Sequence, residues 1–135
     1  DIKKLFHNPK IDYRYDIEEK EQLLFIDRSQ IEQVLINLLK NAEEACAEQP
    51  NPVVKITTSY LKEKHLLLIS VSDNGCGILP DVQEKIFVPF FTTKQKGSGI
   101  GLSLCKQIMS LHGGSISVKS EEGVGSTFTL KFVCR

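Results

Sequence analysis

The spacing of apolar residues changes several times along the chain, and each change marks the boundary of a predicted element. Alternating apolar and polar residues, or a short and densely apolar run, are typical of β-strands. Such patterns occur at 10–17, 22–27, 53–61, 65–73 and in the two arms of a hairpin within 115–133. The 65–73 segment is richer in apolar residues than 53–61, which predicts that it takes the more central position in the sheet.

An amphipathic helix is predicted in the first third of the chain, where apolar residues recur three and four apart. Asp27 or Ser29 can cap its first turn, and Glu32 follows Ser29 at the spacing of a capping box. The pattern continues to about Glu48, and the sequence QPNP at 49–52 stops the helix. The apolar face of this helix consists of Ile31, Val34, Leu35, Leu38, Leu39, Ala42 and Cys46.

A long segment with little periodicity follows the central strands. Residues 74–99 are predicted to form a loop with one turn at 81–87, and a loop of that length in a compact domain is usually functional. A second helix is predicted at 100–114, ended by Gly113 and Gly114. The element order, β-β-α-β-β-loop-α-β-β, predicts a two-layer α/β sandwich with a mixed, mostly antiparallel sheet and helices on one face.

Length and composition limit the class of protein. A chain of 135 residues is long enough for one domain with its own core, and its 17 basic residues balance 17 acidic ones. Zero net charge argues against a nucleic-acid-binding surface, and no apolar run approaches the ~20 residues of a membrane span. The four cysteines lack metal-site spacing, which favours free thiols in a reducing compartment. We therefore expect a cytoplasmic domain that contacts neither nucleic acid nor membrane.

Two asparagines on the first predicted helix are candidates for metal binding. Asn37 and Asn41 are four residues apart, so they share one face of the helix, beside its apolar stripe. Amide oxygens suit a hard cation such as Mg²⁺, which prefers oxygen ligands and keeps several waters. The alternative interpretation is a polar helix flank without a ligand.

A second candidate follows the densely apolar strand, where the sequence reads Asp-Asn-Gly-Cys-Gly. Asp73 can accept a hydrogen bond from a nucleobase amino group, and Gly75 and Gly77 allow the backbone to approach a ligand closely. The alternative is a simple turn, because Asn-Gly is a strong turn signal. The segment GVGSTF at 123–128 is also explained by a hairpin turn, but its Thr127 enters a strand that can line the same pocket.

A third candidate is the glycine-rich start of the second predicted helix. Gly97, Gly99 and Gly101 place flexible N–H groups at a helix N-terminus, which favours anions, and Lys94 and Lys96 add positive charge. The stretch is not a Walker loop, because no lysine follows the last glycine, and it does not follow a buried strand as a dinucleotide fingerprint does. A flexible linker with a solvated charge pair is the alternative.

These motifs occur together in one order, and their combination resembles the catalytic and ATP-binding domain of bacterial sensor histidine kinases. They correspond to the N box, first glycine box, F box, second glycine box and third glycine box of that family: 37–45, 73–78, 87–94, 97–102 and 123–128. The resemblance covers about residues 10–133. It implies the Bergerat-type fold, which gyrase, mismatch-repair and heat-shock-chaperone ATPases share.

The resemblance also implies a role for each matched residue. Asn41 would ligate Mg²⁺ with Asn37 nearby, and Lys94 would join them in catalysis by meeting phosphate or the partner helix. Asp73 would hydrogen-bond the adenine amino group of ATP, supported by Thr127. The remaining nucleotide-binding residues would be Gly75, Gly77, Ile78, Phe87, Thr93, Lys94, Lys96, Gly97, Ser98, Gly99, Ile100, Gly101 and Leu102.

The family's domain organisation is expected here too. Residues 1–9 are interpreted as the end of a linker from an absent dimerisation domain, and 10–135 as the catalytic domain, with an ATP lid at about 79–98. The implied activity is transfer of the γ-phosphoryl group of Mg-ATP to a histidine of the dimerisation domain, followed by a downstream response regulator. The isolated domain is expected to be a monomer, whether or not the whole protein is anchored in a membrane.

One position separates kinase from hydrolase in this resemblance. Asn37 stands where ATP-hydrolysing relatives carry a glutamate that acts as general base, and an amide cannot take a proton. His7 and His65 do not lie in the family's phosphoacceptor pattern, so the acceptor is expected elsewhere. An ATP hydrolase of the same fold and an inactive nucleotide-binding scaffold are the alternatives. Cys76 lies in the predicted adenine loop, so its alkylation or oxidation is expected to block ATP binding.

Overall fold

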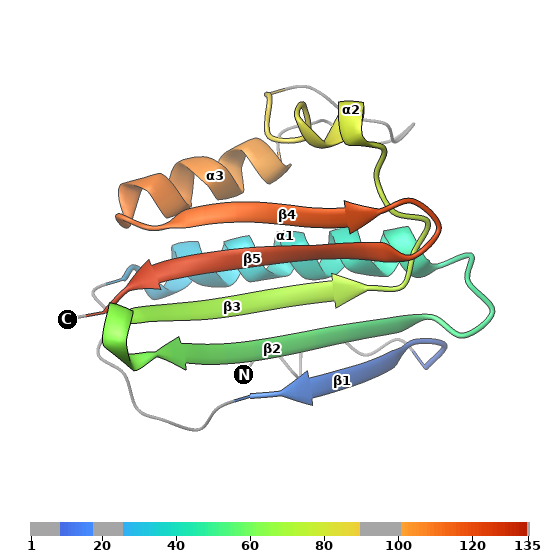
Figure 1. Cartoon of the computed structure of the whole chain (residues 1–135), viewed down its shortest axis with the longest axis horizontal. Coiled ribbons are helices and arrows are strands. Elements are labelled where there is room, and N and C mark those ends of the chain that lie inside the picture. Colours follow the sequence, from blue (N-terminus) through green and yellow to red (C-terminus); the bar gives the residue numbers. More distant parts are fainter. Residues whose placement is uncertain (1–8, 18–25, 90–100, 135) are drawn as a thin grey trace.

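A single sheet organises the computed structural model of this protein, which describes residues 9–17, 26–89 and 101–134. The sheet has five strands in the order β1-β2-β3-β5-β4 (Figure 1). Their bounds are β1 (Asp12–Asp16), β2 (Val53–Leu61), β3 (Leu66–Asp73), β4 (Ser115–Glu121) and β5 (Gly125–Val133). β1 pairs with β2 in parallel and all other pairs are antiparallel. The predicted mixed sheet and the central place of β3 are confirmed.

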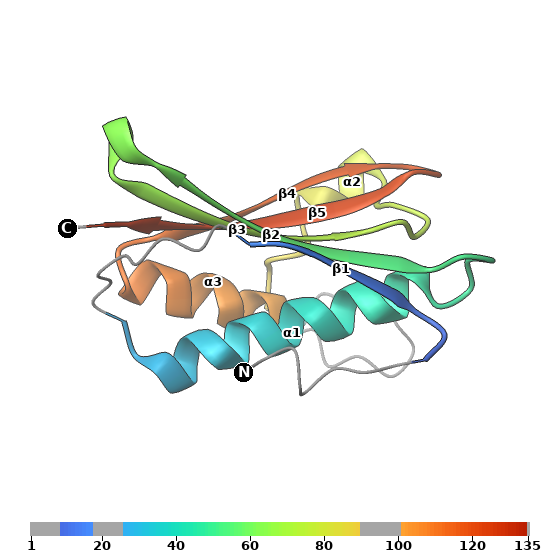
Figure 2. The same ribbon diagram turned by 90° about the horizontal axis from the view of Figure 1, so that it is seen from below.

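The two longer helices, α1 (Arg28–Cys46) and α3 (Gly101–Leu111), lie side by side on one face of the sheet (Figure 2). The predicted two-layer sandwich is therefore confirmed. A single helical turn, α2 (Pro80–Gln83), lies beyond the β4 edge, and a 3-10 turn, η2 (Lys62–Lys64), closes the β2–β3 hairpin. No helix within the described residues is long and apolar enough to span a membrane.

The start of α1 differs from the predicted capping box. Asp27 is the N-cap: its backbone is extended and its Oδ1 accepts hydrogen bonds from the Gln30 N–H at 3.2 Å and the Ser29 hydroxyl at 2.8 Å. Glu32 instead pairs with Arg28, 3.0 Å away and one turn earlier. The ionised carboxylate of Asp27 is the stronger acceptor, so Ser29 becomes part of the first turn. Of the strand predicted at 22–27, residues 22–25 lie outside the described part, and 26–27 are not in a strand.

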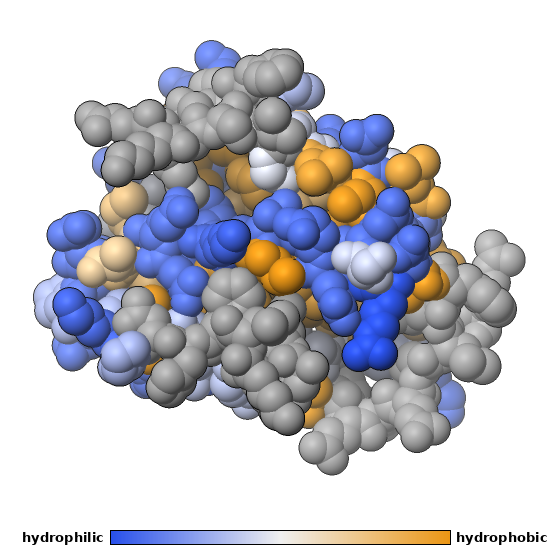
Figure 3. Space-filling view, turned by 180° about the vertical axis from the view of Figure 1, so that it is seen from behind, coloured by the Kyte–Doolittle hydropathy of each residue, from blue (hydrophilic) through white to orange (hydrophobic). Residues whose placement is uncertain are grey.

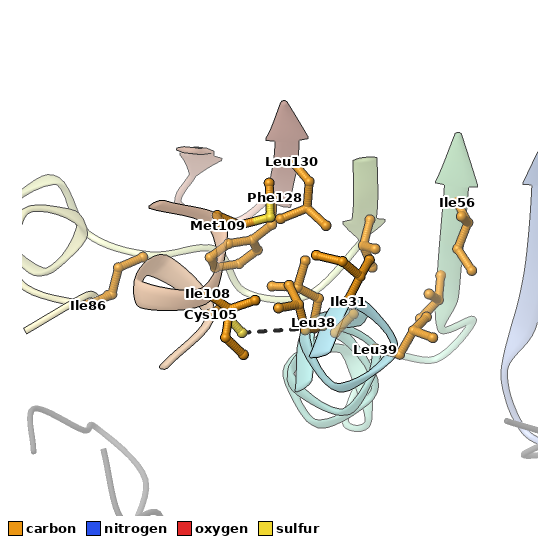
Figure 4. Packing of buried hydrophobic residues seen from close by; sticks show 14 of the residues in the cluster. Ile31, Leu38, Leu39, Ile56, Ile86, Cys105, Ile108, Met109, Phe128 and Leu130 are labelled. Carbon is orange, nitrogen blue, oxygen red and sulfur yellow. Dashed lines mark hydrogen bonds between the residues drawn. The ribbon is translucent and has the colours of Figure 1, made fainter. Parts of the chain in front are cut away.

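The core lies between the sheet and the two helices (Figure 4). Phe128, Leu130 and Phe132 of β5 point into it, each at most 2% exposed. Because side chains of a strand alternate between its two faces, these residues define which face of every neighbouring strand is covered by helices. Val34, Leu38, Leu39, Cys105 and Met109 fill the helix side. The outer surface of the helix layer carries mostly hydrophilic side chains with apolar ones between them (Figure 3).

Candidate functional site

The Asp73 carboxylate ends β3 on the helix-covered face, and only 9% of the residue is exposed. Its Oδ1 accepts a hydrogen bond from the Gly75 N–H at 2.9 Å, and the Ser126 N–H also donates to the carboxylate. Burial raises the pKa of Asp73, and these two hydrogen bonds oppose the rise. When ionised, the carboxylate has only acceptor capacity left, so it suits a ligand that presents a donor.

The third glycine box contributes a residue that the sequence interpretation missed. Ser126 is the register partner of Asp73, whereas Thr127 is the partner of Ser72. The Thr127 and Ser72 hydroxyls hydrogen-bond at 2.8 Å on the face of the sheet away from the helices. The prediction that Thr127 supports Asp73 is therefore wrong, because the Thr127 hydroxyl lies on the opposite face of the sheet from the Asp73 carboxylate. Alternation along β5 was the available signal, since Phe128 on the core face puts Ser126 there and Thr127 on the other face.

The glycines of the first glycine box are required by the protein's own packing. A Cβ on Gly75 would lie 2.3 Å from the carbonyl oxygen of Ala45, near the end of α1. A Cβ on Gly77 would lie 2.2 Å from the carbonyl oxygen of Glu121, and its φ of +79° also favours glycine. The two glycines therefore allow close packing against α1 and the end of β4, whereas the sequence predicts that they allow close approach to a ligand. The loop is wedged between α1 and the β4–β5 turn.

Hydrogen bonds hold this loop against β4 and its turn. The Gly123 N–H donates to the Cys76 carbonyl at 2.7 Å, and the Ile78 N–H donates to the Ser120 hydroxyl at 2.7 Å. The Gln83 side chain of α2 donates hydrogen bonds from Nε2 to two carbonyl oxygens, that of Ile78 at 2.8 Å and that of Ser120 at 3.1 Å. The Cys76 side chain is exposed, and the effect of its modification stays a prediction.

The two asparagines of the N box have different surroundings. Asn37 accepts at Oδ1 from Gln33 Nε2, 3.1 Å away, and donates from Nδ2 to the Cys105 sulfur at 3.7 Å. Both ends of this amide are therefore engaged within the protein. Asn41 lies one helical turn further along α1, toward the Asp73 loop, and is partly exposed. Asn37 thus joins α1 to α3, and its expected role beside Asn41 stays a prediction.

Cys105, in the second turn of α3, is the residue to which Asn37 donates. Its thiol is fully buried and donates to the Val34 carbonyl of α1 at 3.9 Å (Figure 4). Burial raises the pKa of Cys105 to about 11, so the group stays a neutral thiol near pH 7. α3 begins at Gly101, the last glycine of the second glycine box, so this contact fixes the helix that starts in that box against the N box.

The F box enters the core at its first phenylalanine. Phe87 packs edge-on against Phe128, with ring centroids 6.4 Å apart and planes at 85°. Leu102, at the start of α3, is also packed against the core. The remaining lid residues of the predicted set lie outside the described residues, and their roles stay predictions: Thr93, Lys94, Lys96, Gly97, Ser98, Gly99 and Ile100.

The described boxes converge at one end of the sheet, where β3 ends and the β4–β5 turn lies (Figure 1). Residues 26–134 match the sequence model of the family described as "Histidine kinase-, DNA gyrase B-, and HSP90-like ATPase". The chain belongs to this family. It is 40% identical over 121 residues to the signal transduction histidine-protein kinase AtoS of Escherichia coli, covering 90% of this chain and 19% of AtoS. The chain thus spans about a fifth of the length of that relative.

Solved structures of the same family have the same fold. The catalytic domain of histidine kinase ThkA is 38% identical, with a TM-score of 0.78, covering 91% of this chain and 80% of that one. Full-length ShkA, solved in complex with AMPPNP, is 25% identical with a TM-score of 0.79, covering 92% of this chain and 26% of that one. ThkA has also been solved in complex with the response regulator protein TrrA. The expected relation to histidine kinase catalytic domains and the expected Bergerat-type fold are confirmed.

Proposed function

We propose that this domain binds Mg-ATP at the end of β3 and transfers the γ-phosphoryl group to a histidine on a separate dimerisation domain. The observation that carries the proposal is the buried Asp73 carboxylate, which two backbone N–H groups hold in place while its remaining lone pairs stay available. The adenine amino group supplies the donor that this acceptor needs. Family membership and the histidine kinase relatives support the same activity.

Asn41 is the proposed magnesium ligand of the chain. Within the described residues no cluster of three or more His, Cys, Asp or Glu could hold a metal ion. Mg²⁺ bound to a nucleotide takes most of its ligands from phosphates and water, so one amide oxygen from the protein suffices. The bound ion would neutralise phosphate charge during transfer. Lys94 is proposed to contribute charge from the lid.

The absence of a carboxylate base at position 37 favours transfer to histidine over hydrolysis. A neutral imidazole attacks phosphorus with a nitrogen lone pair, so no base has to remove a proton first. In the transfer, the N–P bond forms while the bond between the γ-phosphorus and the ADP oxygen breaks, and ADP leaves. Asn37 carries an amide, which cannot take a proton from water, and its hydrogen bonds go to Gln33 and Cys105.

The partners of the domain follow from this chemistry. The phosphoacceptor is proposed to be a histidine-bearing dimerisation domain, joined through residues 1–9, and a response regulator is proposed to receive the phosphoryl group. The structure of ThkA with a response regulator supports that partner class. The isolated domain is proposed to be a cytoplasmic monomer with a lid at about 79–98.

Radiolabel transfer tests the proposed function. The domain is mixed with Mg-ATP labelled at the γ-phosphate and with a supplied dimerisation domain, and label on the acceptor and free phosphate are both measured. Label on the acceptor that depends on its histidine supports the kinase. Phosphate release at the same rate without any acceptor would instead identify a hydrolase. ATP binding without either product would identify a scaffold.

A further inference from the structure

The Ser120 hydroxyl on β4 makes three short contacts behind the Asp73 site. Its Oγ lies 2.7 Å from the Ile78 nitrogen, 2.7 Å from the Ser126 Oγ and 3.1 Å from the Gly125 carbonyl oxygen. The Ser126 hydroxyl in turn lies on the same face of the sheet as the Asp73 carboxylate, directly across the β3–β5 pair. Ser120 thus contacts both the loop that follows Asp73 and the residue paired with Asp73.

The direction of the hydrogen bond between the two serines follows from the two backbone groups. A backbone N–H can only donate and a carbonyl can only accept, whereas a hydroxyl has one proton and two acceptor sites. Ser120 therefore accepts from Ile78 and donates its single proton to Gly125. One arrangement alone satisfies all three contacts, and in it the Ser126 hydroxyl donates to Ser120. Ser126 is then left with acceptor capacity only.

We propose that Ser120 is a positioning residue for base selectivity: it holds Ser126 as an acceptor, so that Asp73 and Ser126 together select a 6-amino purine. An exocyclic amino group carries two N–H donors, which can donate to Asp73 and to Ser126. A 6-oxo group is itself an acceptor, so it finds two acceptors there and no donor. The inference rests on the proposed ATP site and adds how that site rejects 6-oxo purines. Ser120 acts through Ser126 and does not contact the nucleotide.

The test compares the dissociation constants of ATP and inosine triphosphate, which differ in the 6-amino and 6-oxo groups. Wild type is expected to bind ATP more tightly. In Ser120→Ala the Ser126 proton is released and can donate to the 6-oxo group. The ratio of the two constants should then fall about fivefold, the factor for one neutral hydrogen bond of about 1 kcal/mol. Ser120→Thr keeps the hydroxyl and should keep the ratio.

Gln83→Ala is the matched control for loosening the loop. It removes the two bonds from α2 to the Ile78 and Ser120 carbonyls but leaves both serine hydroxyls in place. Both nucleotides should weaken by the same factor, with an unchanged ratio. An equal fall of the ratio in Gln83→Ala would show that loop mobility causes the effect and would overturn the inference.

Ser126→Ala supplies a second test that does not depend on the stability of Ser120→Ala. It should lower the ratio by itself, and adding Ser120→Ala to it should change the ratio no further, because the effect passes through Ser126. Additive effects in the double variant would overturn the inference, as would an unchanged ratio in Ser120→Ala. A wild-type domain that binds neither nucleotide would overturn the proposed function itself, so the two failures are distinct.

Discussion

Asp73 and Ser126 face each other across β3 and β5, and the Ser126 N–H donates to the Asp73 carboxylate. The first and third glycine boxes, which lie far apart in the sequence, therefore form one structural unit. Gly125 tightens this unit, because a Cβ there would lie 2.1 Å from the Asp73 carbonyl oxygen. The position of the acceptor at the end of β3 thus depends on β5 as much as on β3.

Ser126 and Thr127 provide a direct comparison of two neighbouring hydroxyls. Ser126→Ala is expected to weaken ATP binding about fivefold, because it removes an acceptor beside Asp73. Thr127→Val is expected to leave ATP binding unchanged, because its hydroxyl bonds Ser72 on the opposite face. Calorimetric titration of both variants measures the two effects. Loss of affinity in Thr127→Val alone would contradict the assignment of faces.

Asp73 should make ATP binding pH-dependent. Burial raises the pKa of this carboxyl above its ordinary value of 3.8, and the ionised form is a stronger acceptor for the adenine amino group than the protonated form. ATP affinity should therefore fall as the pH decreases through the raised pKa. This is measured by titrating ATP at a series of acidic pH values at which the domain remains folded. An affinity that is constant across that range would exclude Asp73 as the acceptor.

The stability of the free domain should depend on pH in the opposite sense. A carboxyl whose pKa is raised by folding binds its proton more tightly in the folded state, so its contribution to the free energy of unfolding is fully present below pH 3.8. That contribution is lost as the pH rises through the raised pKa. Urea unfolding of the wild type, referenced to Asp73→Asn at each pH, isolates this contribution. A difference that increases with pH would contradict the sign.

Gly75 and Gly101 are expected to respond differently to the same substitution. Gly75→Ala places a methyl group against the Ala45 carbonyl and should lower the free energy of unfolding by about 2 kcal/mol. Among the described residues no atom lies within 4 Å of a Cβ added at Gly101, so Gly101→Ala should change the free energy of unfolding by less than about 1 kcal/mol. Urea unfolding compares the two. Similar losses in both variants would mean that the loop is not wedged against α1.

Asn37 and Asn41 should differ in their dependence on magnesium. Asn41→Ala is expected to reduce the difference between ATP binding with and without Mg²⁺. Asn37→Ala should keep that difference but lower the free energy of unfolding by about 1 kcal/mol, because its bonds to Gln33 and Cys105 are lost. Calorimetry with and without Mg²⁺, together with urea unfolding, measures both. A loss of the Mg²⁺ effect in Asn37→Ala equal to that in Asn41→Ala would show that Asn37 is a magnesium ligand as well.

Much of the fold could be predicted because local spacing determines it. The α1 stripe, the β2–β3 hairpin and the β4–β5 hairpin were predicted close to their observed bounds, since each buries one regular face. The N-cap was harder, because Asp27 and Ser29 both have capping side chains and only the backbone conformation decides between them. Such a choice depends on geometry that the residue types alone do not contain.

The candidate site was only partly predictable from the sequence. Asp73 and the glycines could be identified because their residue types form a recognisable motif. The alternation of side chains along the last strand could have identified Ser126 in place of Thr127. The contact between Asn37 and Cys105 links residues 68 positions apart, and no local pattern reveals it. The packing of Gly75 on Ala45 is likewise a property of the assembled fold, so the sequence indicated a ligand where the protein itself is the neighbour.

Calorimetric titration of Mg-ATP into the wild-type domain and into Asp73→Asn tests the central claim most directly. Asparagine preserves the size of the side chain but replaces one acceptor oxygen with a donor, opposite the adenine amino group. We predict micromolar-range binding, on the order of 10 µM, by the wild type and a loss of tenfold or more in the variant. Equal affinity in the two folded proteins would contradict the account, because the acceptor at the end of β3 would then not read the base.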